Sequence, residues 1–282
     1  MRKFMLTILT ALCMLSTSLT AYAADTALRT ENQLDESLIA ESRIDEVLEA
    51  KGFPANVLSE LDITTKERFE ERFASDEDIV YGDEQTYYFN VDEDGNLVPA
   101  IMTRGQIPSA ELKLSGIYAN GVKNGNVTTV YYTFRYQWLI LPFQRWQDPI
   151  GIIYNPDLLR FRIGSFEKRD IYVMDGKTYS KEPEQTCAEY NSDGFGWYAD
   201  LTGHQSAPSA LSGVADFELE PKPGTTIKSG TGWTSRMYGK YAHTKANVAA
   251  DFSFSYKNAG GGISFGLPSE NDTQGFIFDI KF

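Results

Sequence analysis

The sequence predicts a mainly β protein, an antiparallel β-sandwich or jelly-roll-like domain preceded by a short N-terminal helical segment. One observation is the alternation of apolar and polar side chains over residues 130–138 and again between residues 252 and 282. A second is that about ten short segments of this kind are separated by turn residues, without helical patterns between them. Because parallel strands need crossover helices, these segments favour antiparallel pairing.

A helical period precedes the strands, in an acidic segment that we place at residues 24–80. Its apolar side chains recur mostly at three- and four-residue spacings, as amphipathic helices require. They are Leu34, Leu38, Ile44, Val47 and Leu48. Gly52 predicts a helix C-cap, Pro54 the first turn of a second helix, and Thr64 with Glu67 a capping box that starts a third. The segment could cover one end of the sandwich, bind a partner or be a removable pro-segment.

The β domain is predicted over residues 81–282. In its clearest strand one face carries Val130, Tyr132, Phe134, Tyr136 and Trp138, which indicates contact with a core. Further strands are predicted at residues 87–91, 111–119, 150–154, 170–174, 196–201, 214–219, 252–256, 263–267 and 276–282.

Residues 1–23 have the three parts of a cleaved secretory signal peptide. Arg2 and Lys3 precede an apolar run at residues 4–15, and Ala21 and Ala23 give a small-x-small end. The run is shorter than the roughly 20 residues that span a bilayer, and Cys13 lies inside it rather than at a lipid-anchor position. We therefore expect cleavage after Ala23 and a secreted, extracellular protein without stable membrane anchoring.

Cleavage would remove two of the 26 basic residues and none of the 39 acidic ones, so the net charge would change from −13 to −15. Such an acidic chain is a poor partner for nucleic acid, whose phosphates bind clustered Lys and Arg. Cleavage would also leave Cys187 as the one cysteine, which excludes an internal disulfide.

The stretch from Asn90 to Leu97 has two interpretations. Alternating oxygen ligands followed by a glycine resemble the first half of an EF-hand calcium loop. However, the first ligand is not an aspartate, and Ile101 occupies the twelfth position, where a bidentate glutamate is needed. A plain hairpin is favoured, because Asp94-Gly95 is a strong turn signal between apolar residues.

No catalytic residue can be assigned from the sequence. A nucleophilic site would combine Cys187 or a serine with His204 or His243, but no Gly-x-Ser-x-Gly elbow is present. Two histidines and one cysteine do not make a usual zinc set, and no phosphate-binding glycine loop is found. We therefore expect neither a metal nor a cofactor. Asp148, close to Trp146, would be the first suspect in a sugar-cleaving groove.

Two further segments each allow a structural and a functional interpretation. Residues 138–146 (WLILPFQRW) either end a core strand, which the alternation favours, or expose Trp138, Phe143 and Trp146 to stack on sugars or dip into a membrane interface. Residues 225–256, rich in Thr, Ser, Gly and Lys, resemble either a sandwich edge or the amphipathic hairpin of a pore-forming toxin.

Three groups of residues carry a family resemblance that spans most of the mature chain. They are Gly52-Phe53-Pro54 with Val57-Leu58 and Lys66; Tyr136-Gln137-Trp138 with Pro142, Arg145 and Asp148-Pro149-Ile150-Gly151; and Tyr238-Gly239-Lys240-Tyr241-Ala242-His243. In these residues the chain resembles an uncharacterised family of secreted Gram-positive proteins. The resemblance implies export and a shared fold, but no activity and no site residues.

These observations favour a secreted, non-enzymatic protein that binds an extracellular partner, either a cell-surface polysaccharide or another protein. A membrane-acting toxin or bacteriocin-like factor is the first alternative, and a secreted hydrolase is the second.

Overall fold

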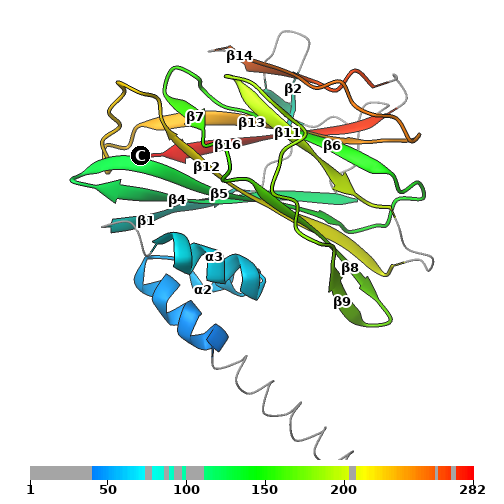
Figure 1. Cartoon of the computed structure of the whole chain (residues 1–282), viewed down its shortest axis with the longest axis horizontal. Helices are drawn as coiled ribbons and strands as arrows, with labels where there is room; N and C mark the ends of the chain where they lie inside the picture. Colours follow the sequence, from blue (N-terminus) through cyan, green and yellow to red (C-terminus); the bar gives the residue numbers. More distant parts are fainter. Residues whose placement is uncertain are drawn as a thin grey trace, which may run out of the picture. The chain divides into compact units, whose positions relative to one another are not determined.

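The computed structural model describes residues 40–73, 78–85, 89–91, 97–99, 111–202, 208–257, 260–267 and 271–282 (Figure 1). The chain is 52% strand and 13% helix, the sheets are antiparallel, and helices at residues 40–73 precede the strands. This confirms the predicted fold class. The chain divides into two compact units, Met1–Ala74 and Ser75–Phe282, which we describe separately. The predicted signal peptide lies outside the described residues.

The first unit contains a helix described over residues 40–50, followed by α2 (Ala55–Leu58) and α3 (Ile63–Phe73). Gly52 ends the first helix as predicted, with a φ of 93° that favours glycine. The Gly52 N–H donates to Glu49 O (2.9 Å) and the Phe53 N–H to Leu48 O (3.1 Å). These two bonds form a Schellman motif.

The predicted capping box at Thr64 is wrong. α3 begins one residue earlier, at Ile63, and Asp62 caps it. The Asp62 carboxylate accepts hydrogen bonds from the Thr65 backbone N–H (3.1 Å) and the Thr65 hydroxyl (2.7 Å). An aspartate that accepts two bonds satisfies the first helical turn, which leaves Thr64 inside the helix.

Aromatic rings and one buried lysine hold the first unit together. The Phe69 ring packs against Phe53 and Phe73, at centroid distances of 5.2 and 5.4 Å. The buried Lys66 ammonium lies 2.7 Å from a Glu41 oxygen and 2.8 Å from an Asp45 oxygen. Burial lowers the pKa of Lys66, but these two carboxylates outweigh it and raise that pKa overall. Lys66 therefore stays charged and ties α3 to the first helix.

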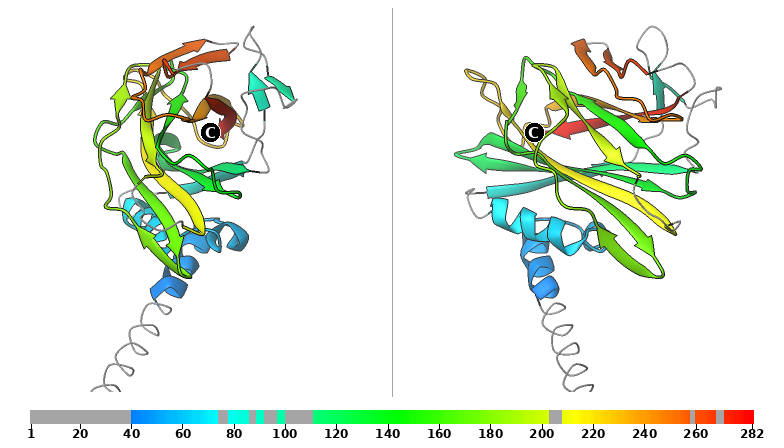
Figure 2. Two further views of the ribbon diagram at one scale, coloured as in Figure 1. Left: turned by 90° about the vertical axis from the view of Figure 1, so that its right-hand side faces the viewer. Right: turned by 45° about the vertical axis from the view of Figure 1, so that its right-hand side comes forward.

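The second unit contains two large sheets, whose strands Figures 1 and 2 show, and two hairpins. In the larger sheet the order is β1-β4-β5-β12-β8-β9, and β7 also pairs with β12. Its strands are β1 (Asp78–Gln85), β4 (Leu112–Lys123), β5 (Asn126–Trp138), β12 (Ala210–Pro221), β8 (Glu167–Met174), β9 (Lys177–Ser180) and β7 (Leu159–Phe161).

The smaller sheet has the order β10-β11-β6-β13-β16. Its strands are β10 (Glu189–Tyr190), β11 (Gly194–Asp200), β6 (Gln147–Ile153), β13 (Thr234–His243) and β16 (Asp272–Lys281). Two separate hairpins are β2 (Phe89–Val91) with β3 (Leu97–Pro99), and β14 (Ser253–Lys257) with β15 (Gly260–Ser264).

Aromatic side chains from both sheets form the core between them. Phe134 of β5 packs against Trp197 of β11 and Phe276 of β16, at centroid distances of 5.5 and 4.9 Å. Gly239 of β13 leaves room for the Phe276 ring, because a Cβ at residue 239 would overlap it. The face of β5 that the sequence assigned to the core, from Val130 to Trp138, is buried as predicted.

Two segments with alternative interpretations are now better defined. Residues 225–256 do not form one hairpin, because β13 pairs with β6 and β16 on its two edges while β14 pairs with β15. At residues 90–97, β2 and β3 pair antiparallel with Val91 opposite Leu97, as a hairpin requires. The candidate calcium ligands at residues 92–96 lie outside the described residues.

Candidate functional site

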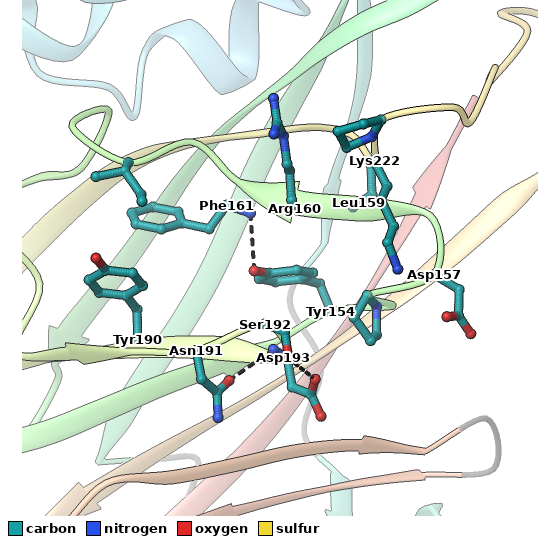
Figure 3. A pocket seen from close by; sticks show the side chains of 13 residues that line it. Tyr154, Asp157, Leu159, Arg160, Phe161, Tyr190, Asn191, Ser192, Asp193 and Lys222 are labelled. Atoms are coloured by element: carbon teal, nitrogen blue, oxygen red, sulfur yellow. Dashed lines mark hydrogen bonds between the residues drawn. The ribbon is translucent and has the colours of Figure 1, made fainter.

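A pocket of about 610 Å³ opens between β7 and the turn that joins β10 to β11 (Figure 3). Its volume falls in the range typical of small-molecule sites. The residues that line it are Tyr154, Pro156, Asp157, Leu159, Arg160, Phe161, Ile163, Tyr190, Asn191, Ser192, Asp193, Lys222 and Pro223.

The first wall consists of β7 and the turn that follows β6. The Asn155 side chain accepts a hydrogen bond from the Asp157 N–H (3.0 Å), and the Asn155 carbonyl accepts one from the Leu159 N–H (3.0 Å). The Tyr154 hydroxyl accepts a bond from the Phe161 N–H (3.0 Å), drawn dashed in Figure 3. These bonds fix the backbone from which the wall's side chains extend.

The second wall is a turn fixed by its own side chains. Asn191 Oδ1 accepts hydrogen bonds from the backbone N–H groups of Asp193 (2.8 Å) and Gly194 (3.0 Å). Asp193 in turn accepts one from the Ser192 hydroxyl (2.7 Å) and one from the Tyr256 N–H of β14 (3.0 Å). Because these polar groups are occupied by structural bonds, the turn is held rigid against β14.

Aromatic rings form the base and one side of the pocket. Phe161 stacks on Phe195 of the core at 4.4 Å and faces Tyr190 at 6.2 Å. Tyr190 is 47% exposed, so part of its side chain is accessible to a ligand. Burial is the largest cause that raises the pKa of Tyr154 to about 12, so this hydroxyl stays neutral while it accepts the Phe161 N–H.

Charged groups of both signs surround this apolar base. Asp157, Arg160 and Lys222 are all exposed, and Arg160 also lies 3.1 Å from Glu220. Figure 3 shows Lys222 and Asp157 at the same end of the pocket. The arrangement offers apolar surface for a ligand's carbon face, with hydrogen-bond donors and acceptors around its edge.

Asp148 and His243, named separately as candidates, lie together in a second cluster away from the pocket. Asp148 is 0% exposed, and one of its oxygens lies 2.8 Å from His243 Nδ1 and accepts the Tyr241 hydroxyl at 2.7 Å. Its other oxygen accepts the Thr244 N–H at 2.8 Å. The Trp138 indole N–H donates to the Tyr241 hydroxyl at 3.2 Å.

This cluster is enclosed rather than open to a substrate. Within the described residues, the His243 ring hydrogen-bonds to Asp148 and to no hydroxyl or thiol. The suggestion that Asp148 could serve a sugar-cleaving groove finds no support, because a carboxylate that is 0% exposed cannot flank a scissile glycosidic bond.

Cys187 does not join His243. Cys187 lies two residues before β10, and β10 is separated from β13 by β11 and β6. Three steps between neighbouring strands put the two strand axes about 14 Å apart. Burial raises the pKa of the Cys187 thiol, which is the opposite of nucleophile activation. His204 lies outside the described residues.

A second buried network, of hydrogen bonds and ion pairs, lies beside Tyr241. Tyr136, whose ring lies 5.8 Å from that of Tyr241, donates its hydroxyl hydrogen to Asp170 (2.8 Å). Lys168 lies 2.9 Å from both Asp170 and Glu184. Burial lowers the pKa of Lys168, but these carboxylates outweigh it and raise that pKa overall. Lys168 thus compensates the buried Asp170 charge.

The two tryptophans of residues 138–146 have different environments. Trp138 is buried and Trp146 is exposed, so they cannot form one stacking platform. The described residues contain no group of three or more His, Cys, Asp or Glu side chains placed to hold a metal ion. None of the helices in the described ranges is long and apolar enough to cross a membrane.

The pocket could not be predicted from the sequence. The local signals at its walls are two sequences typical of tight turns, Asn155-Pro156-Asp157 and Asn191-Ser192-Asp193-Gly194. Neither turn indicates that the other lies beside it.

Comparisons with known proteins give no family. No family model and no curated protein matches the chain. A solved structure described as "AvmM Catalyzes Macrocyclization in Alchivemycin A Biosynthesis" matches with 14% identity, covers 61% of this chain and 89% of its own, and has a TM-score of 0.25. A likeness this distant supports no inference about function.

Proposed function

We propose that this chain is a secreted, non-enzymatic binding protein and that the pocket between β7 and the β10–β11 turn takes a carbohydrate ligand. The observation that carries the proposal is the half-exposed Tyr190 ring, which packs at a tilt against Phe161 in the lining of an open pocket with a polar edge. Export is inferred from residues 1–23 alone.

A carbohydrate suits this pocket because a sugar ring has an apolar C–H face and a rim of hydroxyls. An accessible tyrosine face can stack on the former. Asp157 can accept hydrogen bonds from hydroxyls, while Arg160 and Lys222 can donate to them. Because the edge carries both signs, a neutral polar ligand fits better than a strongly charged one.

The contacts favour binding over hydrolysis. Glycoside cleavage uses two carboxyl groups that flank the scissile bond. In the pocket, both oxygens of Asp193 accept structural hydrogen bonds. Asp193, the second carboxylate among the described lining residues, is therefore held in the turn and against β14, which favours a structural role for it over an acid–base one.

The proposal is tested with a glycan array followed by calorimetric titration of the best polysaccharide against the purified chain. Tyr190→Ala should weaken binding at least about tenfold, because it removes the stacking face that we assign to the ligand. The matched control is Tyr179→Ala. Tyr179 is 40% exposed and stacks on Tyr172 at 5.3 Å, but it does not line the pocket.

Two results would contradict the proposal. One is the absence of any glycan ligand across the array and across preparations of bacterial surface polysaccharide. The other is a ligand whose affinity falls equally in the Tyr190 and Tyr179 variants. For export, the amino-terminal sequence of protein recovered from culture medium should begin at Ala24.

A further inference from the structure

The connection from β5 to β6, residues 139–146, exposes several large apolar side chains, and we call it the apolar loop. Its exposed members are Leu139, Ile140, Phe143 and Trp146. Phe143 is 98% exposed, so the protein covers almost none of its ring. Scattered surface hydrophobics are ordinary, but four exposed large apolar side chains within eight residues of one loop are a local concentration of the kind that marks an interaction site.

The apolar loop is anchored at both ends, so its exposure is not the result of a frayed chain end. The N–H groups of Leu139 and Ile140 donate to the Glu111 carbonyl, at 2.7 and 3.3 Å. At the other end, the Leu201 N–H donates to the Trp146 carbonyl at 3.0 Å. Trp138, immediately before the loop, is buried in the core. The backbone therefore holds the apolar side chains outward.

The charge of this segment contrasts with that of the chain. The protein has 39 acidic residues and a net charge of −13, yet residues 137–147 contain no carboxylate and a single charge, Arg145. A guanidinium beside an exposed tryptophan complements a phosphate group at the level where lipid headgroups meet acyl chains.

We propose that the apolar loop docks the protein on the surface of a phospholipid bilayer, with Phe143 inserted among the acyl chains and Arg145 at the headgroup phosphates. A protein partner would have to supply a pocket around a ring that projects this far, whereas a bilayer accepts a convex apolar tip without a preformed pocket. Because the loop itself carries Arg145 and no carboxylate, its own charge favours approach to lipid phosphates.

The test is flotation of the predicted secreted form, which begins at Ala24, with phosphatidylcholine vesicles. This form lacks the apolar residues 4–15, which would bind lipid by themselves. The wild-type chain should float with the vesicles, and Phe143→Ser should reduce the bound fraction at least about tenfold, because it removes the most exposed apolar ring. Lipids brominated on their acyl chains should quench tryptophan fluorescence in the wild type and much less in Trp146→Phe.

The matched control is Trp233→Ser, which removes an exposed aromatic from another part of the second unit and should leave flotation unchanged. Absence of wild-type flotation would overturn the proposal, as would flotation that Phe143→Ser leaves intact. Self-association that Phe143→Ser abolishes, without vesicle binding, would instead show the loop to be a protein contact and would also overturn it. Circular dichroism of each variant verifies that it is folded.

The carbohydrate proposal does not depend on this inference. The apolar loop precedes β6 and the pocket's Tyr154 follows it, so the two sites lie at opposite ends of one strand. Phe143→Ser should leave glycan binding unchanged, and Tyr190→Ala should leave flotation unchanged. Each proposal can therefore fail while the other stands.

Discussion

Replacement of Asp148 by alanine should destabilise the second unit strongly, although Asp148 does not line the pocket. Asp148 is fully buried and lies within 2.8 Å of three polar groups, on Tyr241, His243 and Thr244. Alanine would leave all three without their acceptor. Each buried, unsatisfied group costs about 1–3 kcal/mol of folding free energy. The variant no longer buries the Asp148 carboxylate, and the desolvation cost that it thereby avoids offsets part of this loss.

We therefore expect Asp148→Ala to lower the free energy of unfolding by about 3–5 kcal/mol, which corresponds to a fall in Tm of about 10 °C for a unit of this size. Asp148→Asn should cost less, about 2 kcal/mol, because its remaining oxygen can still accept the Thr244 N–H. Denaturant unfolding followed by tryptophan fluorescence measures both, since the Trp138 ring lies 5.0 Å from His243.

Two comparisons make this prediction specific. Asp157→Ala, at an exposed aspartate, should change stability by less than about 0.5 kcal/mol. Tyr241→Phe should destabilise the wild type but cost less in the Asp148→Ala background, because the bond from the Tyr241 hydroxyl to Asp148 is already lost there, while the bond from the Trp138 N–H is lost in both backgrounds. The reasoning is refuted if Asp148→Ala costs no more than Asp157→Ala, or if Tyr241→Phe costs the same in both backgrounds.

Two further predictions follow from the core. Gly239→Ala should cost more than about 2 kcal/mol in unfolding experiments, because the new methyl would overlap the Phe276 ring; Gly262→Ala, with open space around it, is the control and should be nearly neutral. Burial raises the pKa values of Tyr118 and Tyr154 to about 12, whereas an unfolded tyrosine ionises near about pH 10. The folded state keeps these protons longer, so stability should be intact below about pH 10 and fall as the pH rises towards 12. Circular dichroism in denaturant titrations should then show that the free energy of unfolding falls as the pH rises from about 10 to 12; a stability that does not change over this range would contradict the argument.

Strand prediction succeeded where all the side chains on one face of a strand pack into the core. The alternation from Val130 to Trp138 identified β5 because each alternate side chain meets the opposite sheet. It missed β7 (Leu159–Phe161) and β10 (Glu189–Tyr190), which have three and two residues, too few to show a period of two. Their pairing with β12 and β11 defines them. The prediction also missed β1, β9 and the ten-residue β13. In β13 the consecutive residues Met237, Tyr238 and Gly239 are all buried, so the alternation is lost there.

The buried cluster illustrates why candidate residues could be named but not joined. Asp148 and His243 are 95 residues apart. They meet because β6 and β13 pair antiparallel with Ile150 opposite Tyr241, and two residues further along this register Asp148 faces His243. The register follows from packing against the whole core. The local sequence around either residue therefore cannot reveal their contact.

Strand β6 also separates the two proposed sites by a distance that its geometry fixes. It has seven residues, from Gln147 to Ile153, and a strand rises about 3.3 Å per residue, so it spans about 23 Å. The apolar loop ends directly before it and the pocket begins with Tyr154 directly after it. A protein docked through Phe143 would thus hold its pocket more than 20 Å along the strand from the loop, beyond the Debye length of about 8 Å at physiological salt. Ligand binding in the pocket should therefore be insensitive to lipid charge, a result that a single shared site at the membrane would not give.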